Sequence, residues 1–124
     1  MRLLDDRQTT GKLGEDLATE ELWHQGYAIL ARRYRTRFGE IDIVAQDGDT
    51  VVFVEVKARR TDRFGTAAES ITAWKQRRIA AMALDYLARC GWPESPCRFD
   101  VVAIDGVATD KLTMQHIKSA FCAE

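Results

Sequence analysis

Two neighbouring strand patterns between residues 39 and 60 carry charges where a strand core is normally apolar. Residues 51–54 (VVFV) begin a nearly continuous apolar run, which is typical of a strand covered on both faces. Glu55 and Lys57 interrupt this run near its end. Because strand side chains alternate between faces, positions 55 and 57 share one face, so an anion and a cation project side by side.

Asp42 occupies a matching place in the preceding strand pattern, between two isoleucines. The Asp47-Gly48-Asp49 sequence predicts a turn that folds this strand back alongside the next one. We therefore expect Asp42 to meet Glu55 and Lys57 on one sheet face.

The size and composition of the chain predict one globular domain over residues 1–124, with residues 1–9 flexible. The chain is 46% hydrophobic and 30% charged, which supplies material for a single core. Its net charge of −1 is unevenly spread, because residues 32–78 hold 11 Lys and Arg against 7 Asp and Glu. A cationic middle segment is compatible with a local phosphate-binding surface, although a solvated charged face is the commoner meaning.

The cysteines and the N-terminus bear on the compartment. The three cysteines form no C-x-x-C pair and lie far in sequence from both histidines, so we expect no zinc site. No apolar run has the length of a signal-peptide core or of a membrane span. We interpret the chain as a reduced, cytoplasmic protein.

Periodicity predicts an α/β fold with a mixed five-stranded sheet flanked by two main helices, in the order α-β-β-β-α-β-β. The first helix starts near Thr10 and turns Leu13, Leu17, Ala18 and Leu22 inward, and the second spans about residues 66–89 with an inward stripe from Ala68 and Ile71 to Leu87. The predicted strands are 27–33, 39–46, 50–58, 98–104 and 111–117, followed by an irregular tail over 118–123.

Two charged residues lie on the apolar sides of these helices. Glu15 lies at the margin of the first helix's inward face, where an acid favoured by the helix dipole is the commoner reading. Lys75 falls inside the stripe of the second helix, where a lysine either extends its stem to the surface or points at the acids on the sheet. Asp100, in the fourth strand, either faces inward or is an ordinary residue at the start of a strand, and we favour the second interpretation.

Arginines follow the ends of the first and third strands. Such residues suit contacts with phosphate, and interleaved aromatic rings could stack on bases, although half-exposed strand ends often look alike. The candidates are Arg35, Arg37, Arg59, Arg60 and Arg63, with Tyr34 and Phe38 among the first group.

Two carboxylates that converge on a strand pair form a hard-oxygen site of the kind that Mg²⁺ or Mn²⁺ prefers. A lysine beside such an ion could orient water or stabilise charge on a phosphodiester. The alternative is that Glu55 and Lys57 form an ion pair that closes the strand, with Asp42 exposed. An acid-x-lysine spacing alone is common by chance.

Several motifs together resemble the PD-(D/E)xK nuclease superfamily, which has a restriction-endonuclease-like core. More closely, the chain resembles the YraN-like family of uncharacterised bacterial proteins, itself similar to archaeal Holliday-junction resolvases. Ile41-Asp42 stands where the superfamily has Pro-Asp, which keeps the acid. The motifs that carry the resemblance are GKLGEDLA (11–18), GEIDIVA, VFVEVKARR, FGTAAESITAWKQRRI and RFDVVAI.

This resemblance implies a metal-dependent DNA endonuclease, acting on branched or structured DNA, with Mg²⁺ or Mn²⁺ as cofactor. It implies Asp42, Glu55 and the Val56 carbonyl as metal ligands and Lys57 as the catalytic lysine. Glu15 would be an additional acid, and Lys75 or its neighbour Gln76 an auxiliary residue. Cleavage of branched DNA would imply a symmetric homodimer. A different possibility is a nuclease fold that serves as a binding module without catalysis.

Overall fold

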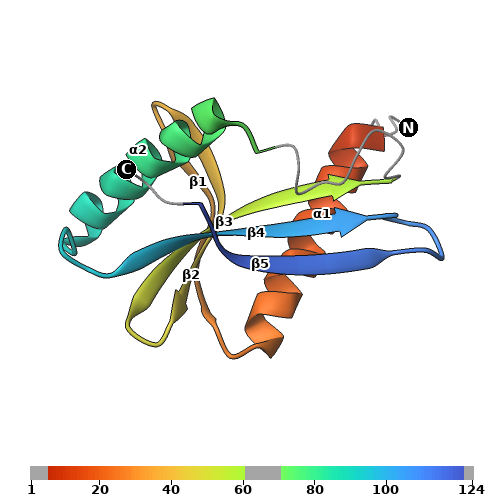
Figure 1. The fold of residues 1–124 in the computed structure, drawn as a ribbon, viewed down its shortest axis with the longest axis horizontal. Coiled ribbons are helices and arrows are strands. Elements are labelled where there is room, and N and C mark those ends of the chain that lie inside the picture. Colours follow the sequence, from red (N-terminus) through yellow and green to blue (C-terminus); the bar gives the residue numbers. More distant parts are fainter. Residues whose placement is uncertain (1–5, 61–70, 122–124) are drawn as a thin grey trace, which may run out of the picture.

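The computed structural model of the chain describes residues 6–60 and 71–121, which form two helices and five strands (Figure 1). The predicted α/β class and the predicted order of elements are confirmed. The elements are α1 (Asp6–His24), β1 (Ala28–Thr36), β2 (Gly39–Asp47), β3 (Thr50–Arg59), α2 (Ala73–Cys90), β4 (Cys97–Asp105) and β5 (Thr113–Phe121).

The strands lie in the sheet in sequence order, β1-β2-β3-β4-β5. The β3 and β4 strands pair parallel and the other neighbours pair antiparallel, so the sheet is mixed. A parallel pair requires a crossover connection, and α2 lies in it. The β2–β3 hairpin closes with Asp47 opposite Thr50, which confirms the predicted turn.

Two apolar cores cover the two faces of the sheet, one under each helix (Figure 1). The α1 core includes Ala18 and Leu22, both fully buried. On β3, Val54 belongs to the α1 core and Phe53 to the α2 core, so odd-numbered residues of this strand face α2. Neither described helix is long and apolar enough to cross a membrane. The α2 side chains buried in the second core are Ile79, Met82, Ala83, Tyr86 and Leu87.

The start of α1 and the end of β5 differ from the prediction. The α1 helix begins at Asp6 rather than near Thr10, inside the segment 1–9 that was expected to be flexible. The β5 strand continues to Phe121, whose ring stacks on a buried phenylalanine of β4, so the start of the expected tail over 118–123 is strand. Pairing with β4 orders this segment despite its polar sequence. The rest of that tail lies outside the described residues.

The inward face of α1 also differs from the prediction, because Leu13 is 40% exposed. Gly14 meets the sheet instead. A Cβ atom at Gly14 would lie 2.3 Å from the Ala58 Cβ, closer than any real contact. Only a glycine allows α1 to lie this close to the end of β3, and the close approach brings the next residue, Glu15, beside the sheet.

The α2 helix begins at Ala73, later than the predicted start near residue 66, and residues 66–70 lie outside the described part of the chain. Thr72 caps the helix by accepting a hydrogen bond from the Lys75 backbone N–H at 3.2 Å. Ile71 therefore precedes the helix and packs against two β4 residues, rather than extending the helical stripe as predicted.

Asp100 is fully buried, so its interpretation as an ordinary residue at the start of a strand is wrong. Arg98 Nε donates to its Oδ1 at 3.1 Å, His116 Nε2 lies 2.7 Å from its Oδ2, and the Ser119 N–H donates at 3.0 Å. Burial raises the pKa of Asp100, but these hydrogen bonds outweigh burial and leave the pKa lowered. Arg98 also donates to Asp47 at 2.9 Å, which ties the β2–β3 hairpin to β4.

Candidate active site

Asp42 lies at the point where the side chains of β2 change the sheet face to which they point, and where β2 stops pairing with β3. Ile43 packs in the α1 core and Ile41 in the α2 core, although residues two apart share a face in a regular strand. The paired register of β2 with β3 ends at Ile43 and Val54. The Asp42 side chain therefore enters a place where backbone pairing has stopped.

The Asp42 carboxyl group accepts a β3 backbone hydrogen bond that no β2 backbone carbonyl accepts at this point. The Val56 N–H donates to Asp42 Oδ2 at 2.8 Å. Because the N–H and C=O of one strand residue point to the same side, the Val56 carbonyl also faces this gap. A hydrogen bond joins the Asp42 and Glu55 side chains. Two carboxyl groups and one backbone carbonyl thus converge at the end of the pairing between β2 and β3.

Burial and the adjacent Glu55 raise the pKa of Asp42 to about 8, while the hydrogen bond from the Val56 N–H acts in the opposite direction. Without a bound cation, Asp42 therefore holds a proton at neutral pH. The alternative pairs Glu55 with Lys57 and leaves Asp42 exposed; the ion pair is present, but Asp42 is partly buried, so that part of the alternative is wrong.

Two lysines lie beside this carboxyl pair on the α2 face of the sheet. Lys57 Nζ is 3.6 Å from Glu55 Oε1, and the two side chains are 22% and 16% exposed. Lys75 extends from α2 toward Lys57, and contact with the Lys57 side chain, burial and the Lys57 charge lower the pKa of Lys75. Of the two orientations left open for Lys75, the structure has the one that lies beside Glu55. Its neighbour Gln76 turns back to the Ile71 carbonyl at 3.4 Å.

Glu15 reaches the opposite side of the cluster from α1, but two arginines of β1 hold its oxygens. Arg32 Nε and Arg33 Nε donate to Glu15 Oε1 and Oε2 at 3.0 and 2.9 Å. Arg33 has a left-handed backbone with φ of 53°, which is uncommon for a residue with a side chain. In the pairing of β1 with β2, Arg33 lies opposite Asp42, where the side chains of β2 also change face. Both strands are therefore irregular at the same point.

Glu40 belongs to this region although the sequence analysis does not select it. It lines a cavity of about 370 Å³ together with Glu15, Asp42 and Val56. It also lines a second cavity, of about 70 Å³, that includes Glu55 and Lys75. The signal in the sequence is its spacing, because it precedes Asp42 by two residues.

The predicted nucleic-acid-binding arginines lie at two places. Arg35 is at the end of β1, with its guanidinium 3.4 Å from the Glu40 carboxylate, and the Arg37 guanidinium lies over the Phe38 ring at 4.9 Å. Arg59 ends β3 and Arg60 follows it, close in sequence to Lys57. Arg63 lies outside the described residues.

Among the described residues, no three His, Cys, Asp or Glu side chains come together in a cluster that could hold a metal ion. Asp42 and Glu55 are adjacent, whereas Glu15 faces its arginines. The convergent group is thus a carboxyl pair with a backbone carbonyl rather than three acids.

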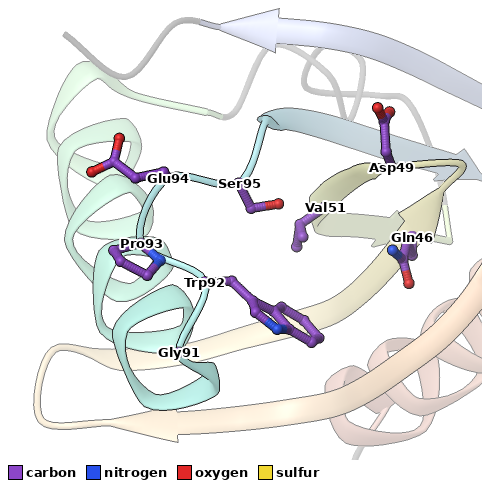
Figure 2. Close-up of a pocket in the computed structure, with 8 residues that line it drawn as sticks. All are labelled: Gln46, Asp49, Val51, Gly91, Trp92, Pro93, Glu94 and Ser95. Carbon is purple, nitrogen blue, oxygen red and sulfur yellow. The ribbon is translucent and has the colours of Figure 1, made fainter.

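A different cavity, of about 620 Å³, opens at the other end of β3 (Figure 2). Trp92 extends into it from the loop after α2, beside Val51. Val51 is six residues before Lys57, or about 20 Å along the strand. The described residues that line this cavity include two acids, Asp49 and Glu94, and no Lys or Arg. It contributes nothing to the candidate site and does not suit a phosphate.

Comparison with known proteins finds one family. The model of the uncharacterised protein family UPF0102 matches residues 14–104, a range that includes all five candidate catalytic residues. A UPF0102 protein of Symbiobacterium thermophilum is 51% identical over 113 residues, which cover 91% of this chain and 96% of that protein. A UPF0102 protein of Desulfosudis oleivorans is 49% identical over 121 residues, which cover 98% of this chain and 96% of that protein.

Proposed function

The chain belongs to the uncharacterised protein family UPF0102, the YraN-like family that its sequence resembles, and we propose that it is a metal-dependent DNA endonuclease. The observation that carries this proposal is the half-buried carboxyl pair of Asp42 and Glu55, with Lys57 and Lys75 beside it. A carboxyl group with a strongly perturbed pKa and specific charged neighbours is typical of a functional site.

The donor set fits Mg²⁺ or Mn²⁺. These ions take oxygen ligands, keep several waters and need only one or two protein carboxylates. Asp42, Glu55 and the Val56 carbonyl would hold the ion, with the proton on Asp42 lost to solvent. Such an ion supplies positive charge that stabilises the developing charge on a phosphodiester. Glu15 is held by two arginines and lies in the adjacent cavity, so it serves the site as an outer acid.

Lys57 would supply the second positive group. Its ammonium lies on the same side as Glu55 and can donate hydrogen bonds to a phosphate oxygen and to the attacking water. The attacking water loses a proton as its oxygen bonds to phosphorus, the ester P–O bond breaks, and the departing oxygen takes up a proton. Lys75 touches Lys57 and, with its lowered pKa, can take part in that proton movement.

The substrate class follows from the arginines around the site. Arg35 and Arg37 lie near the end of β1, and Arg59 and Arg60 at the end of β3; in the proposed complex they would contact the phosphate backbone. DNA, including branched DNA, is the substrate we propose. Cutting two strands of a junction would require two copies of the chain.

The test is cleavage of labelled duplex, single-stranded and four-way DNA with Mg²⁺ or Mn²⁺. We expect Lys57→Ala to lower the cleavage rate on the order of a hundredfold, the range found when one stabilising donor is removed from an active site. Lys118→Ala is the matched control, because Lys118 is an exposed lysine on β5 whose ammonium lies over the Tyr27 ring. No cleavage by the wild type, or equal cleavage by wild type and Lys57→Ala, would contradict the proposal.

One observation favours a second candidate, a nucleic-acid-binding module without catalysis. Among the described residues no third acid joins Asp42 and Glu55, because Glu15 is engaged by Arg32 and Arg33. Such a module would bind DNA equally well in EDTA and in Mg²⁺, and Asp42→Asn would leave its binding unchanged. The cleavage assay, run beside a binding assay with the same DNA, separates the two candidates.

A further inference from the structure

The β1–β2 turn and the first turns of α2 present two exposed aromatic rings that share one arginine. Trp74 is 58% exposed and Phe38 is 39% exposed. The Arg78 guanidinium lies over the Trp74 ring, 4.6 Å from its centroid, and its Nε donates to the Phe38 carbonyl at 2.9 Å. Its Nη2 donates to the same carbonyl. One cation therefore fixes the two segments relative to each other.

The turn that carries Phe38 is shaped for this contact. Thr36 Oγ1 accepts from the Phe38 N–H at 2.9 Å and donates to the Gly39 carbonyl at 3.1 Å. Gly39 has a φ of 127°, and a Cβ atom there would lie 2.4 Å from Arg78 Nη2. A side chain at position 39 would strain the backbone and displace the guanidinium.

These two rings lie at the rim of the candidate active site. Arg78 lines the 70 Å³ cavity together with Glu55 and Lys75. Trp74 immediately precedes Lys75 in α2, and the first turn of α2 contains no acidic residue. The Arg37 guanidinium lies over the Phe38 ring. The surface therefore combines exposed rings with positive charge, which complements a polyanion.

We propose that Trp74 and Phe38, held by Arg78, form a stacking platform for unpaired bases of a DNA strand whose backbone passes over the Glu55 and Lys75 cavity. Aromatic rings interleaved with arginines bind single strands in this way, because every base has a face that can stack. A paired base inside a duplex has no free face for these rings. The platform thus narrows the proposed substrate class to DNA with single-stranded nucleotides next to the cleaved bond, and this narrowing rests on the proposed function.

The experiment measures binding without cleavage. A fluorescently labelled 12-nucleotide oligothymidine and an abasic strand of the same length are titrated with protein in EDTA at one low salt concentration, and anisotropy is recorded. The two strands carry the same phosphates, so the difference in their Kd values reports base stacking. We expect the wild type to bind oligothymidine about tenfold more tightly than the abasic strand.

The variants assign that difference to the platform. Trp74→Ala should lower the affinity for oligothymidine about tenfold, to that of the abasic strand, while Trp74→Phe should keep most of the difference. Trp23→Ala is the matched control, because Trp23 is also an exposed tryptophan, at 65%. It lies at the end of α1, before β1 begins, whereas Phe38 of the platform follows the end of β1. All variants should show the wild-type circular dichroism spectrum.

Equal binding of the two strands by the wild type, or equal losses in Trp74→Ala and Trp23→Ala, would overturn the platform. Failure of the platform and failure of the proposed function are distinguishable because this assay contains no metal and requires no turnover. A wild type that cleaves DNA but binds both strands equally loses only the platform. A wild type that never cleaves but binds through Trp74 keeps the platform and loses the nuclease proposal.

Discussion

Asp42 and Asp100 are aspartates of the same sheet, yet the chain surrounds them in opposite ways. Asp100 receives hydrogen bonds from Arg98, His116 and the Ser119 N–H, and its pKa is lowered. Asp42 receives one backbone N–H and faces a second carboxyl group, and its pKa is raised to about 8. A buried carboxylate whose hydrogen bonds the protein satisfies is structural, whereas a carboxyl group that faces a second acid would be stabilised in its charged form by a bound cation.

The largest expected effect is the difference between Asp100→Asn and Asp42→Asn in the free energy of unfolding. Asp100→Asn should lower the free energy of unfolding by about 3 to 5 kcal/mol, because it removes one partner from a buried ionic network. Asp42→Asn should leave the stability of the metal-free protein unchanged or higher, since an amide reproduces the protonated acid and can still accept from the Val56 N–H. Urea unfolding in EDTA measures both. Equal losses in the two variants would remove the distinction.

The next effect is the change in the free energy of unfolding with pH, which is smaller for each pH unit. The pKa of Asp42 is about 8 in the folded protein and 3.8 for an unperturbed aspartate, so between these pH values the folded state binds one more proton than the unfolded state. The Asp42 contribution to stability in EDTA should therefore fall as pH rises from about 4 to 8, by at most about 1.4 kcal/mol per unit for one proton.

Asp100 should contribute with the opposite sign. Its folded pKa lies below 3.8, so its stabilisation is present above that pH and is lost as pH falls through the folded value.

Subtracting the pH profile of the free energy of unfolding of Asp42→Asn from that of the wild type isolates the contribution of Asp42. A difference that does not fall between pH 4 and 8 would mean that Asp42 is charged in the metal-free protein.

The sequence predicts β2 and β3 well because both are apolar runs bounded by glycine or turn residues, and alternation then places Glu55 and Lys57 on one face. Helical spacing likewise places Lys75 in an apolar stripe, but it leaves open whether the side chain extends to the surface or points at the acids on the sheet. The order of elements follows from these patterns. The roles of the site residues remain predictions.

Features that depend on contacts between distant segments could not be predicted in this way. Asp100 is buried because Arg98 and His116 of two strands meet it, and nothing near it in sequence indicates the histidine. The face change of β2 at Asp42 and the left-handed backbone of Arg33 arise from strand irregularities that periodicity does not register. Leu13 is exposed because its helix approaches the sheet through the neighbouring glycine.

The most direct test of the central claim, that Asp42 and Glu55 form a cation site, is calorimetric titration of the metal-free protein with Mn²⁺ at pH 7. We predict one ion per chain and release of about one proton, read from the dependence of the heat on the buffer, because a pKa near 8 leaves Asp42 protonated beforehand. Asp42→Asn should lose this binding, and Asp85→Asn, which changes an aspartate bonded to the Tyr34 hydroxyl, should retain it. No binding by the wild type, or unchanged binding by Asp42→Asn, would contradict the account.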